Sequence, residues 1–344
     1  MPTLAVVIPV HQGGEKFRCC LAAVLAGKEP PEELIVIIDG QDDGSGDFAA
    51  GQGAQVLRTA VRGGPALARN LGARQATSDL LLFLDADVQA PPELFGRVRS
   101  LMQREPGVTA AIGCYDDAPQ AKGLASQYKN LLQHYVHQSA RERGFTFWGA
   151  CGVVRREAFI AAGGYDERYT RPCIEDIELG SRLTRAGCEI RLAKDLSVRH
   201  LKHWTWLKLM RSDFFDRALP WSELILRTGR AERDLNLDDK SRAAVALGLL
   251  AVSALTVSPA LPLCALLAAA LLSAQIALDL PLLAFFRRKR GLAFALATIP
   301  LHRAYYLIGG IAFGAALVRH AARLIKRAIG RRPRTLLDRT RSDS

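Results

Sequence analysis

Two acidic residues separated by a single residue, Asp85 and Asp87, follow the apolar run LLLFL at residues 80–84. Leaving a carboxylate unpaired beside a buried strand is costly, so two acids at this position need a partner. In an extended segment, the side chains of residues i and i+2 point to the same side. Such a pair can hold a hard divalent cation that also binds phosphate oxygens, although the tripeptide alone is more often a solvated turn.

Two further segments place polar residues where a nucleotide could bind. Asp39 ends the apolar run IVIID, and its carboxylate can accept a hydrogen bond from a nucleobase or a ribose hydroxyl. The alternative is an ordinary turn built from Asp and Gly. The segment RGGPALARNLGARQA at 62–76 begins a helix with Gly-Gly-Pro and includes Arg69. A helix N-terminus with arginines suits a pyrophosphate, whereas the alternative is a glycine turn before a charged surface helix.

A third acidic pair, Glu175 and Asp176, begins a predicted helix that follows the double glycine at 163–164. Acids are favoured in a first helical turn in any case, because they interact with the helix dipole. A carboxylate in this position can also act as a general base toward a substrate hydroxyl.

The elements that must position these acids are short apolar runs that alternate with helical segments. We expect five strands from the apolar runs and helices at 15–27 and 64–77. The predicted strands are residues 4–10, 33–39, 55–60, 80–85 and 108–115. This alternation predicts an α/β sandwich with a mainly parallel sheet, in which ligands bind at the carboxyl ends of the strands.

The chain becomes far more apolar after residue 242. Residues 243–278 include no charged side chain, and Pro259 and Pro262 interrupt them, which predicts two membrane helices in a hairpin. The alternative is a buried hairpin of a soluble protein. A further apolar segment at 304–318 follows the basic cluster at 287–290. The basic residues at 287–290 and those after 318 both predict a cytosolic location, which requires an even number of spans, whereas three apolar segments are obvious. The number of spans therefore stays between two and four.

The composition limits the partners and the compartment. The 344 residues have a net charge of +12, and the C-terminal stretch is rich in Arg and Lys, which implies an anionic partner. Seven cysteines without a repeated metal-ligand spacing indicate reduced thiols in the cytosol. The first residues are strand-like and lack a basic n-region, so we expect no signal peptide and a cytosolic first domain.

Across residues 4–204, the order VVIPVH, IIDG, GGPALARN, LFLDADV, GGYDE, EDIELGSRL and His200 resembles the family-2 glycosyltransferases. The resemblance implies a GT-A fold, a Rossmann-like α/β/α sandwich, followed here by C-terminal transmembrane helices. It also implies an inverting reaction with a nucleotide-sugar donor and Mg²⁺ or Mn²⁺. The expected division is a catalytic domain at 1–204, an interfacial linker at 205–242, membrane helices at 243–320 and a basic cytosolic tail at 321–344.

The resemblance also implies roles for individual residues. Asp176 would be the catalytic base, and Asp87 with His200 would bind the metal. The donor side would comprise Pro9, Val10, His11, Asp39, Arg69, Asp85 and Ala86. The acceptor side would comprise Gly164, Tyr165, Glu175, Arg217 and Trp221.

The sequence departs from the family pattern at two places. His11-Gln12 stands where Tyr-Asn is common, and Arg217 and Trp221 match the Q-x-x-R-W segment of processive members only loosely, without its Gln. We therefore expect a single transfer rather than polysaccharide synthesis.

The combined expectation is an inverting glycosyltransferase on the cytosolic face of the inner or plasma membrane, multi-pass, with a lipid or lipid-linked acceptor. The alternative is a membrane-tethered nucleotide-sugar-binding protein without activity. Nucleic acid is not expected as a partner, because anionic lipid explains a basic tail that follows an apolar segment.

Overall fold

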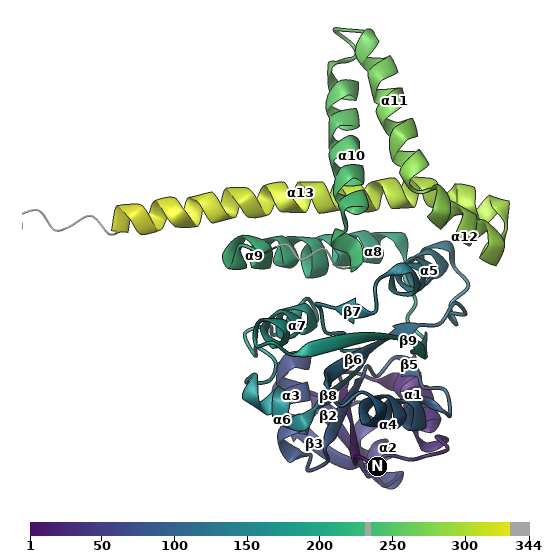
Figure 1. Cartoon of the computed structure of the whole chain (residues 1–344), viewed down its shortest axis with the longest axis vertical. Coiled ribbons are helices and arrows are strands. Elements are labelled where there is room, and N and C mark those ends of the chain that lie inside the picture. The colour runs from purple at the N-terminus through teal and green to yellow at the C-terminus, as the bar shows by residue number, and fades with distance from the viewer. Residues whose placement is uncertain (231–234, 331–344) are drawn as a thin grey trace, which may run out of the picture.

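Strands and helices alternate through the first two hundred residues of the computed structural model, which describes residues 1–230 and 235–330 (Figure 1). The strands are β1 (Leu4–Val10), β2 (Glu33–Asp39), β3 (Gln55–Thr59), β4 (Leu80–Leu84), β5 (Val88–Gln89), β6 (Val108–Tyr115), β7 (Arg143–Gly144), β8 (Cys151–Arg155) and β9 (Glu189–His200). The helices of this region are α1 (Gly14–Leu25), α2 (Ser45–Gly51), α3 (Pro65–Gln75), α4 (Leu94–Arg104), α5 (Leu124–Ser139), α6 (Arg156–Ala161) and α7 (Glu175–Arg185). The five predicted strands and both predicted helices are confirmed, with ends that differ by at most two residues.

One sheet organises this region, in the order β3-β2-β1-β4-β8-β6-β9-β5, with β7 paired to β9. The β3-β2-β1-β4 half is parallel, as predicted. The other half is mixed, because β8 runs antiparallel to both β4 and β6, whereas β6 and β9 are parallel. Figure 1 shows α1, α2 and α4 on one face of the sheet and α3, α6 and α7 on the other.

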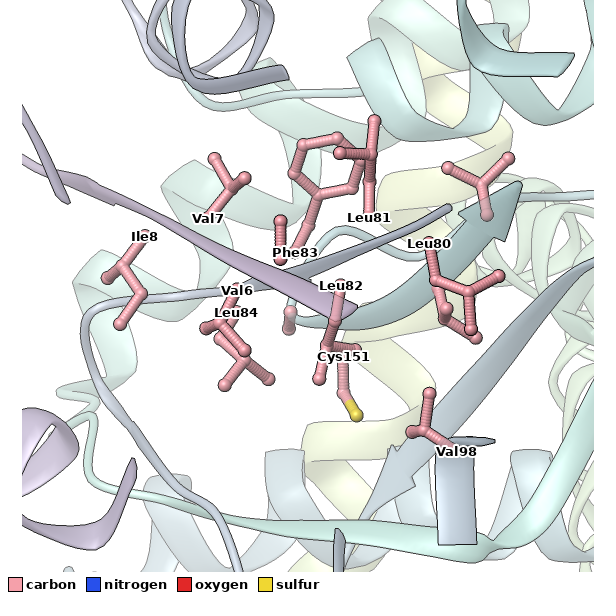
Figure 2. Close-up of a cluster of buried hydrophobic side chains, with 14 of the residues drawn as sticks. Val6, Val7, Ile8, Leu80, Leu81, Leu82, Phe83, Leu84, Val98 and Cys151 are labelled. Carbon is pink, nitrogen blue, oxygen red and sulfur yellow. The ribbon is translucent and has the colours of Figure 1, made fainter. Parts of the chain in front are cut away.

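The core lies on both faces of the central strands. All five residues of β4 and nearly all of β1 are buried, which explains why their sequences are continuously apolar rather than alternating. Figure 2 shows these side chains together with Val98 of α4 and Cys151 of β8. Because β1 and β4 are rigidly packed, the loops after their carboxyl ends leave the sheet at fixed positions.

A layer of helices lies between this α/β region and the apolar C-terminal part. It begins with α8 (Trp206–Ser212), which continues as a π-helical segment, η1 (Asp213–Ala218), and as α9 (Leu219–Thr228). The Thr205 hydroxyl caps α8 by accepting a hydrogen bond from the Lys208 amide at 3.4 Å. After the short 3₁₀ turn η2 (Leu235–Leu237) come α10 (Asp239–Val257), α11 (Leu263–Leu278), α12 (Leu280–Arg290) and α13 (Leu292–Gly330).

The helical hairpin predicted at 243–278 is present as α10 and α11, which pack against each other. By length and composition, α10 and the 292–326 part of α13 could each cross a membrane, and α11 with α12, bent by 60° at their junction, could form a third span. The division of the chain at residues 204, 242 and 320 remains a prediction. Residues 331–344 of the predicted tail lie outside the described residues.

Candidate active site

The D-x-D pair lies at the carboxyl edge of the sheet, where β4 ends. The side chains of Asp85 and Asp87 are 33% and 26% exposed, so both reach the surface of the site rather than the core. Ala86 between them is also partly exposed. The Asp85 amide donates to the Ala150 carbonyl at 3.4 Å, which links the loop to the segment before β8.

His200 faces Asp87, although 113 residues separate them in the sequence. Antiparallel pairing of β5 with β9 sets Val88 opposite His200, and the His200 Nε2 atom lies 3.9 Å from Asp87 Oδ2. The imidazole stacks on the Tyr115 ring at 4.1 Å. Burial, reinforced by the Lys202 ammonium, lowers the pKa of His200 to about 3. The ring is therefore neutral at physiological pH and keeps a lone pair for a metal ion.

This pair has the chemistry and spacing of two ligands of one divalent cation. Ligands about 2.1 Å from an ion lie roughly 3 to 4 Å apart, which includes the separation of Asp87 and His200. Within the described residues, no group of three or more His, Cys, Asp or Glu side chains is placed to hold a metal. A Mg²⁺-like ion commonly takes only one or two protein ligands and completes its shell with water and substrate phosphates, so two residues suffice.

Arg69 of α3 links the D-x-D pair to the start of α7. It is 4% exposed and donates to Asp85 Oδ1 at 2.7 Å and to Glu175 Oε1 at 2.9 Å. The Glu175 carboxylate also accepts from the Cys173 amide at 2.8 Å. The predicted donor-side residue Arg69 and the predicted acceptor-side residue Glu175 are thus paired with each other inside the protein. This pair fixes the position of α7 relative to Asp85.

Asp39 organises the loop before α3. It is 3% exposed, and its two carboxylate oxygens accept from the Gly63 amide at 2.7 Å and the Gly64 amide at 2.8 Å. Its backbone carbonyl lies 2.9 Å from His11 Nδ1. The Thr59 hydroxyl also lies 3.2 Å from Asp39 Oδ1, so Oδ2 is the oxygen with a further lone pair to offer. The predicted contact to a nucleotide remains a prediction beside this structural role.

The loop after β1 provides the remaining predicted donor residues. Pro9 is partly exposed, His11 is exposed, and Val10 is 1% exposed, so Val10 offers only its backbone. In the parallel register with β2, Pro9 pairs with Ile37 and Val10 with Ile38, next to Asp39.

Asp176 lies in the first turn of α7 and is partly exposed. Its Oδ2 atom accepts from the Gly149 amide at 3.2 Å. Burial, with repulsion from the neighbouring Glu175, raises the pKa of Asp176 to about 6, although Arg69 and Arg217 oppose the shift. A carboxylate with this pKa is ionised at neutral pH and still basic enough to accept a proton.

The loop before α7 holds two further predicted acceptor-side residues. Tyr165 is 2% exposed, with its ring among Phe83, Phe147 and Phe159. Gly164 has a φ of +68°, and a Cβ there would lie 2.6 Å from Asn70 Oδ1. Both residues support the loop from inside, and Tyr165 reaches the site only through the Arg69 guanidinium, 5.3 Å from its ring.

The helical layer brings Arg217 near Asp176, whereas within the described part of the chain Trp221 has no recorded contact with the other predicted site residues. Arg217 belongs to η1, and its side chain is solvent-exposed, while its charge interacts with that of Asp176. Trp221 is partly exposed on α9. Lys129 of α5 donates to Asp213 Oδ1 at 2.5 Å, a buried ion pair that fixes η1 on the α/β region. π-helical turns are rare and frequently occur at functional sites.

Sequence reasoning missed two contributors to this site. Tyr115 supports His200 by stacking, and its position at the end of a predicted strand was the available signal. Gly149 binds Asp176 through its backbone, and a Cβ there would lie 2.8 Å from the Arg69 guanidinium. A backbone contact of this kind cannot be predicted from the residue type.

A mixed α/β sheet with a D-x-D pair and a helix-borne carboxylate at its carboxyl edge defines a domain of the GT-A type. The sequence model of the family described as Glycosyl transferase family 2 matches residues 5–163. Glycosyltransferase AglE of Haloferax volcanii is 32% identical over 208 residues, which cover 58% of this chain and 67% of AglE. The chain belongs to glycosyltransferase family 2.

Other relatives match over smaller shares of their own length. O-antigen biosynthesis protein RfbC of Myxococcus xanthus is 24% identical over 213 residues, which are 55% of this chain and 16% of RfbC. Probable glucomannan 4-beta-mannosyltransferase 1 of Arabidopsis thaliana is also 24% identical, and 39% of it is covered. The chain therefore spans less than half the length of these two relatives.

A solved structure confirms the fold beyond the sequence match. Mannosyltransferase PcManGT from Pyrobaculum calidifontis, in complex with GDP-Man and Mn²⁺, has a TM-score of 0.60 and 18% identity. The similarity covers 91% of this chain and 87% of that one. At this identity it shows that the fold is shared.

Proposed function

We propose that this protein transfers a glycosyl group from a nucleotide sugar to an acceptor hydroxyl, with inversion at the anomeric carbon. The observation that supports this most is the convergence of Asp87, His200 and Asp176 at one edge of the sheet. Asp176 accepts the proton of the acceptor hydroxyl while the oxygen of that hydroxyl bonds to the anomeric carbon. The bond from that carbon to the donor diphosphate breaks on the opposite side, and the nucleoside diphosphate leaves.

Asp87 and His200 would hold Mg²⁺ or Mn²⁺, which when bound supplies positive charge beside the leaving diphosphate. PcManGT is described with both GDP-Man and Mn²⁺, which supports a nucleotide-sugar donor and a divalent metal for this fold. Asp85, held by Arg69, would contact the sugar or ribose part of the donor. Pro9, His11 and Asp39 would contact the nucleoside.

The acceptor we propose is a lipid or lipid-linked molecule, with catalysis on the cytosolic face of the inner or plasma membrane. Arg217 and Trp221 lie on the helices that connect the site to the apolar C-terminal part. Beside them, loop 168–173 and α9 border an open cleft of ≈ 240 Å³. Its lining combines Arg171, Phe215 and Leu219 with the ion pair of Arg319 and Glu223. That composition suits a molecule with an anionic head and an apolar chain.

The test uses the purified full-length protein with a panel of UDP- and GDP-sugars, Mn²⁺ and total lipid extract. We expect release of nucleoside diphosphate and incorporation of sugar into lipid from at least one donor, both lost on removing the metal. Donor binding without turnover would instead support a tethered binding protein. Failure of the whole panel to bind would overturn the proposal.

A further inference from the structure

Three apolar helices follow the α/β region, yet their arrangement differs from that of a bundle of spans. Figure 1 shows the α10–α11 hairpin projecting away from the α/β region, whereas α13 runs crosswise beneath it. Helices that cross a bilayer share one general direction, because each must traverse the same ~30 Å of hydrocarbon. The hairpin and α13 therefore cannot both cross.

The face of α13 that points toward the α/β region contacts other helices of the protein over a length equal to a membrane crossing. At one end, His302 Nδ1 lies 2.8 Å from the Tyr128 hydroxyl of α5. At the other end, Arg323 donates to Glu223 of α9 at 3.3 Å. These contacts are 21 residues apart, which corresponds to about 32 Å of helix. Between them, Ala312 and Ala316 are buried together with Leu219 at the start of α9.

The opposite face of α13 is apolar, and beyond the point where α10 packs on it at Gly310 it is uncovered. At helical spacing, Arg319, Arg323 and Lys326 share the face of Ala312 and Ala316. Large apolar side chains on the other side are 41–71% exposed: Ile311, Phe313, Leu317, Val318, Leu324 and Ile325. Helix α10 crosses α13 on this exposed side, where a Cβ on Gly310 would lie 2.9 Å from Leu249. An amphipathic helix of this kind lies in the plane of the membrane interface.

The uncharged arms of the hairpin are short for a crossing, although α10 reaches the length of a span when its polar first turn is included. The uncharged part of α10, residues 243–257, is fifteen residues or about 22 Å long, and α11, with sixteen residues, is about 24 Å. A crossing requires about 20 residues. The base is polar, since Asp279, at the end of α11, pairs with Arg303 and lies 3.6 Å from Lys240 at the start of α10.

The tip of the hairpin, residues 258–262, is built for hydrocarbon rather than for water. It has no charged residue, and Leu261 and Leu263 are 52% and 71% exposed. The amides of Ser258, Ala260 and Leu261 all donate to carbonyls of the preceding turn. The other two tip residues are prolines and have no amide hydrogen. In a bilayer core every backbone donor must be satisfied internally, and this tip meets that condition.

We infer that the described part of the chain attaches to one face of the membrane and does not cross it. The α10–α11 hairpin enters the bilayer and returns to the same side, while α13 lies along the interface. Lys289 and Arg290 of α12 then contact Asp117 and Gln127 of the α/β region, which places the return point beside the catalytic edge. This topology keeps the basic residues at 287–290 and those after 318 on one side of the membrane, although three apolar segments are present. It does not depend on the proposed activity.

The test is thiol accessibility of the full-length protein in sealed membrane vesicles, using a membrane-impermeant maleimide and peptide mapping to separate native cysteines. Gln52→Cys, exposed immediately after α2, reports the catalytic side, and Ala260→Cys reports the tip. We expect labelling of Gln52→Cys from one side only, and of Ala260→Cys only after detergent is added. An epitope fused after Ser344 should be cleaved by protease from the same side as Gln52→Cys.

Labelling of Ala260→Cys from the side opposite Gln52→Cys would show a crossing hairpin, and an epitope on the opposite side would show a crossing α13. Either result overturns the inference. A second pair of variants reports the environment of the tip without labelling. Ala260→Asp should lower the membrane-bound fraction several-fold, because it puts a charge into hydrocarbon, whereas Ala260→Leu should not. Equal membrane-bound fractions for both variants would contradict a buried tip.

Discussion

Asp176 is the residue whose surroundings most directly suggest a chemical task. Its carboxylate lies in the first turn of α7, where the Gly149 amide donates to it at 3.2 Å. The adjacent Glu175 does not compete for the same task, because its oxygens are taken up by Arg69 and by the Cys173 amide. Two neighbouring acids thus have separate roles that follow from burial and partners rather than from residue type.

Asp176→Asn should lower transfer by about 10²–10⁴-fold, because the amide cannot accept the acceptor proton. Binding of the donor should persist, since the amide oxygen can still accept from Gly149. Transfer is measured as sugar incorporated into acceptor, and donor binding by calorimetry. Glu157→Gln, in the first turn of α6, is the matched control for an acid in a first helical turn. Loss of donor binding in Asp176→Asn would contradict the assignment as base.

The pH dependence of transfer should report the ionisation of Asp176. Its pKa is about 6, and as the proposed base it acts in the ionised form. The rate should therefore be near its plateau above pH 7 and should fall about tenfold per pH unit below pH 6. The measurement is kcat at saturating donor and metal between pH 4.5 and 8. A rate that stays constant down to pH 5 would exclude Asp176 as the base.

Asp87→Ala should abolish metal-dependent donor binding. Removal of one of the two proposed protein ligands leaves His200 alone, and a neutral imidazole binds Mg²⁺ or Mn²⁺ weakly. The readout is the rise in apparent melting temperature that Mn²⁺ and donor together produce, relative to donor alone. Asp47→Ala, an acid 89% exposed on α2, serves as the control. An unchanged Mn²⁺ effect in Asp87→Ala would refute the metal assignment.

At the scale of elements, the loops of the site are stacked on one another. Asp39 at the end of β2 holds the amides of Gly63 and Gly64, and Gly64 has a φ of +89°. The loop before α7 lies directly over this turn, because a Cβ on Gly64 would come within 2.4 Å of the Thr170 backbone. The position of α7, and with it Asp176, therefore depends on a glycine in another loop.

Gly64→Ala should reduce activity much more than its cost in stability explains. At φ +89° and ψ 169°, Gly64 adopts a conformation essentially restricted to glycine, which costs alanine on the order of 1–3 kcal/mol, and the new methyl group also displaces Thr170. Gly53→Ala is the matched control, since Gly53 has a φ of +84° but no neighbour within 4 Å. Both variants should still be folded at the assay temperature in thermal unfolding, with the larger loss of stability in Gly64→Ala, while only Gly64→Ala loses transfer. Equal activity of the two variants would contradict this coupling.

The sequence predicted those elements whose pattern lies within one short segment, and it did not predict those that depend on contacts between distant residues. Strands such as 4–10 and 33–39 are continuous apolar runs, and the structure reproduces them residue for residue. The antiparallel β8 was not predicted, since its five residues gain their meaning only between β4 and β6. The Arg69–Glu175 pair joins residues 106 apart, a separation that no spacing rule covers. Helix α13 continues through Pro300 and joins the residues from 292 onward to the apolar segment noted at 304–318.

At the scale of the whole molecule, the α/β region and the apolar helices are joined by buried polar contacts rather than by a simple linker. Tyr128 of α5 meets His302 of α13, and Lys129 of the same helix pairs with Asp213 of η1. Asp279, with no exposed surface, holds the base of the hairpin through Arg303 and through the Tyr306 hydroxyl at 2.9 Å. These contacts fix the direction in which the hairpin leaves the catalytic side.

Asp279→Ala should therefore loosen the hairpin base and lower the stability of the full-length protein in detergent. Without the carboxylate, the largely buried Arg303 guanidinium loses its ion-pair partner, at a cost of about 3–5 kcal/mol for a broken buried pair. We expect a lower melting temperature and faster proteolysis within residues 235–290. Glu93→Ala, which removes an exposed ion pair with Lys28, should leave both unchanged. A melting temperature for Asp279→Ala equal to that of Glu93→Ala would mean that this buried carboxylate does not fix the hairpin.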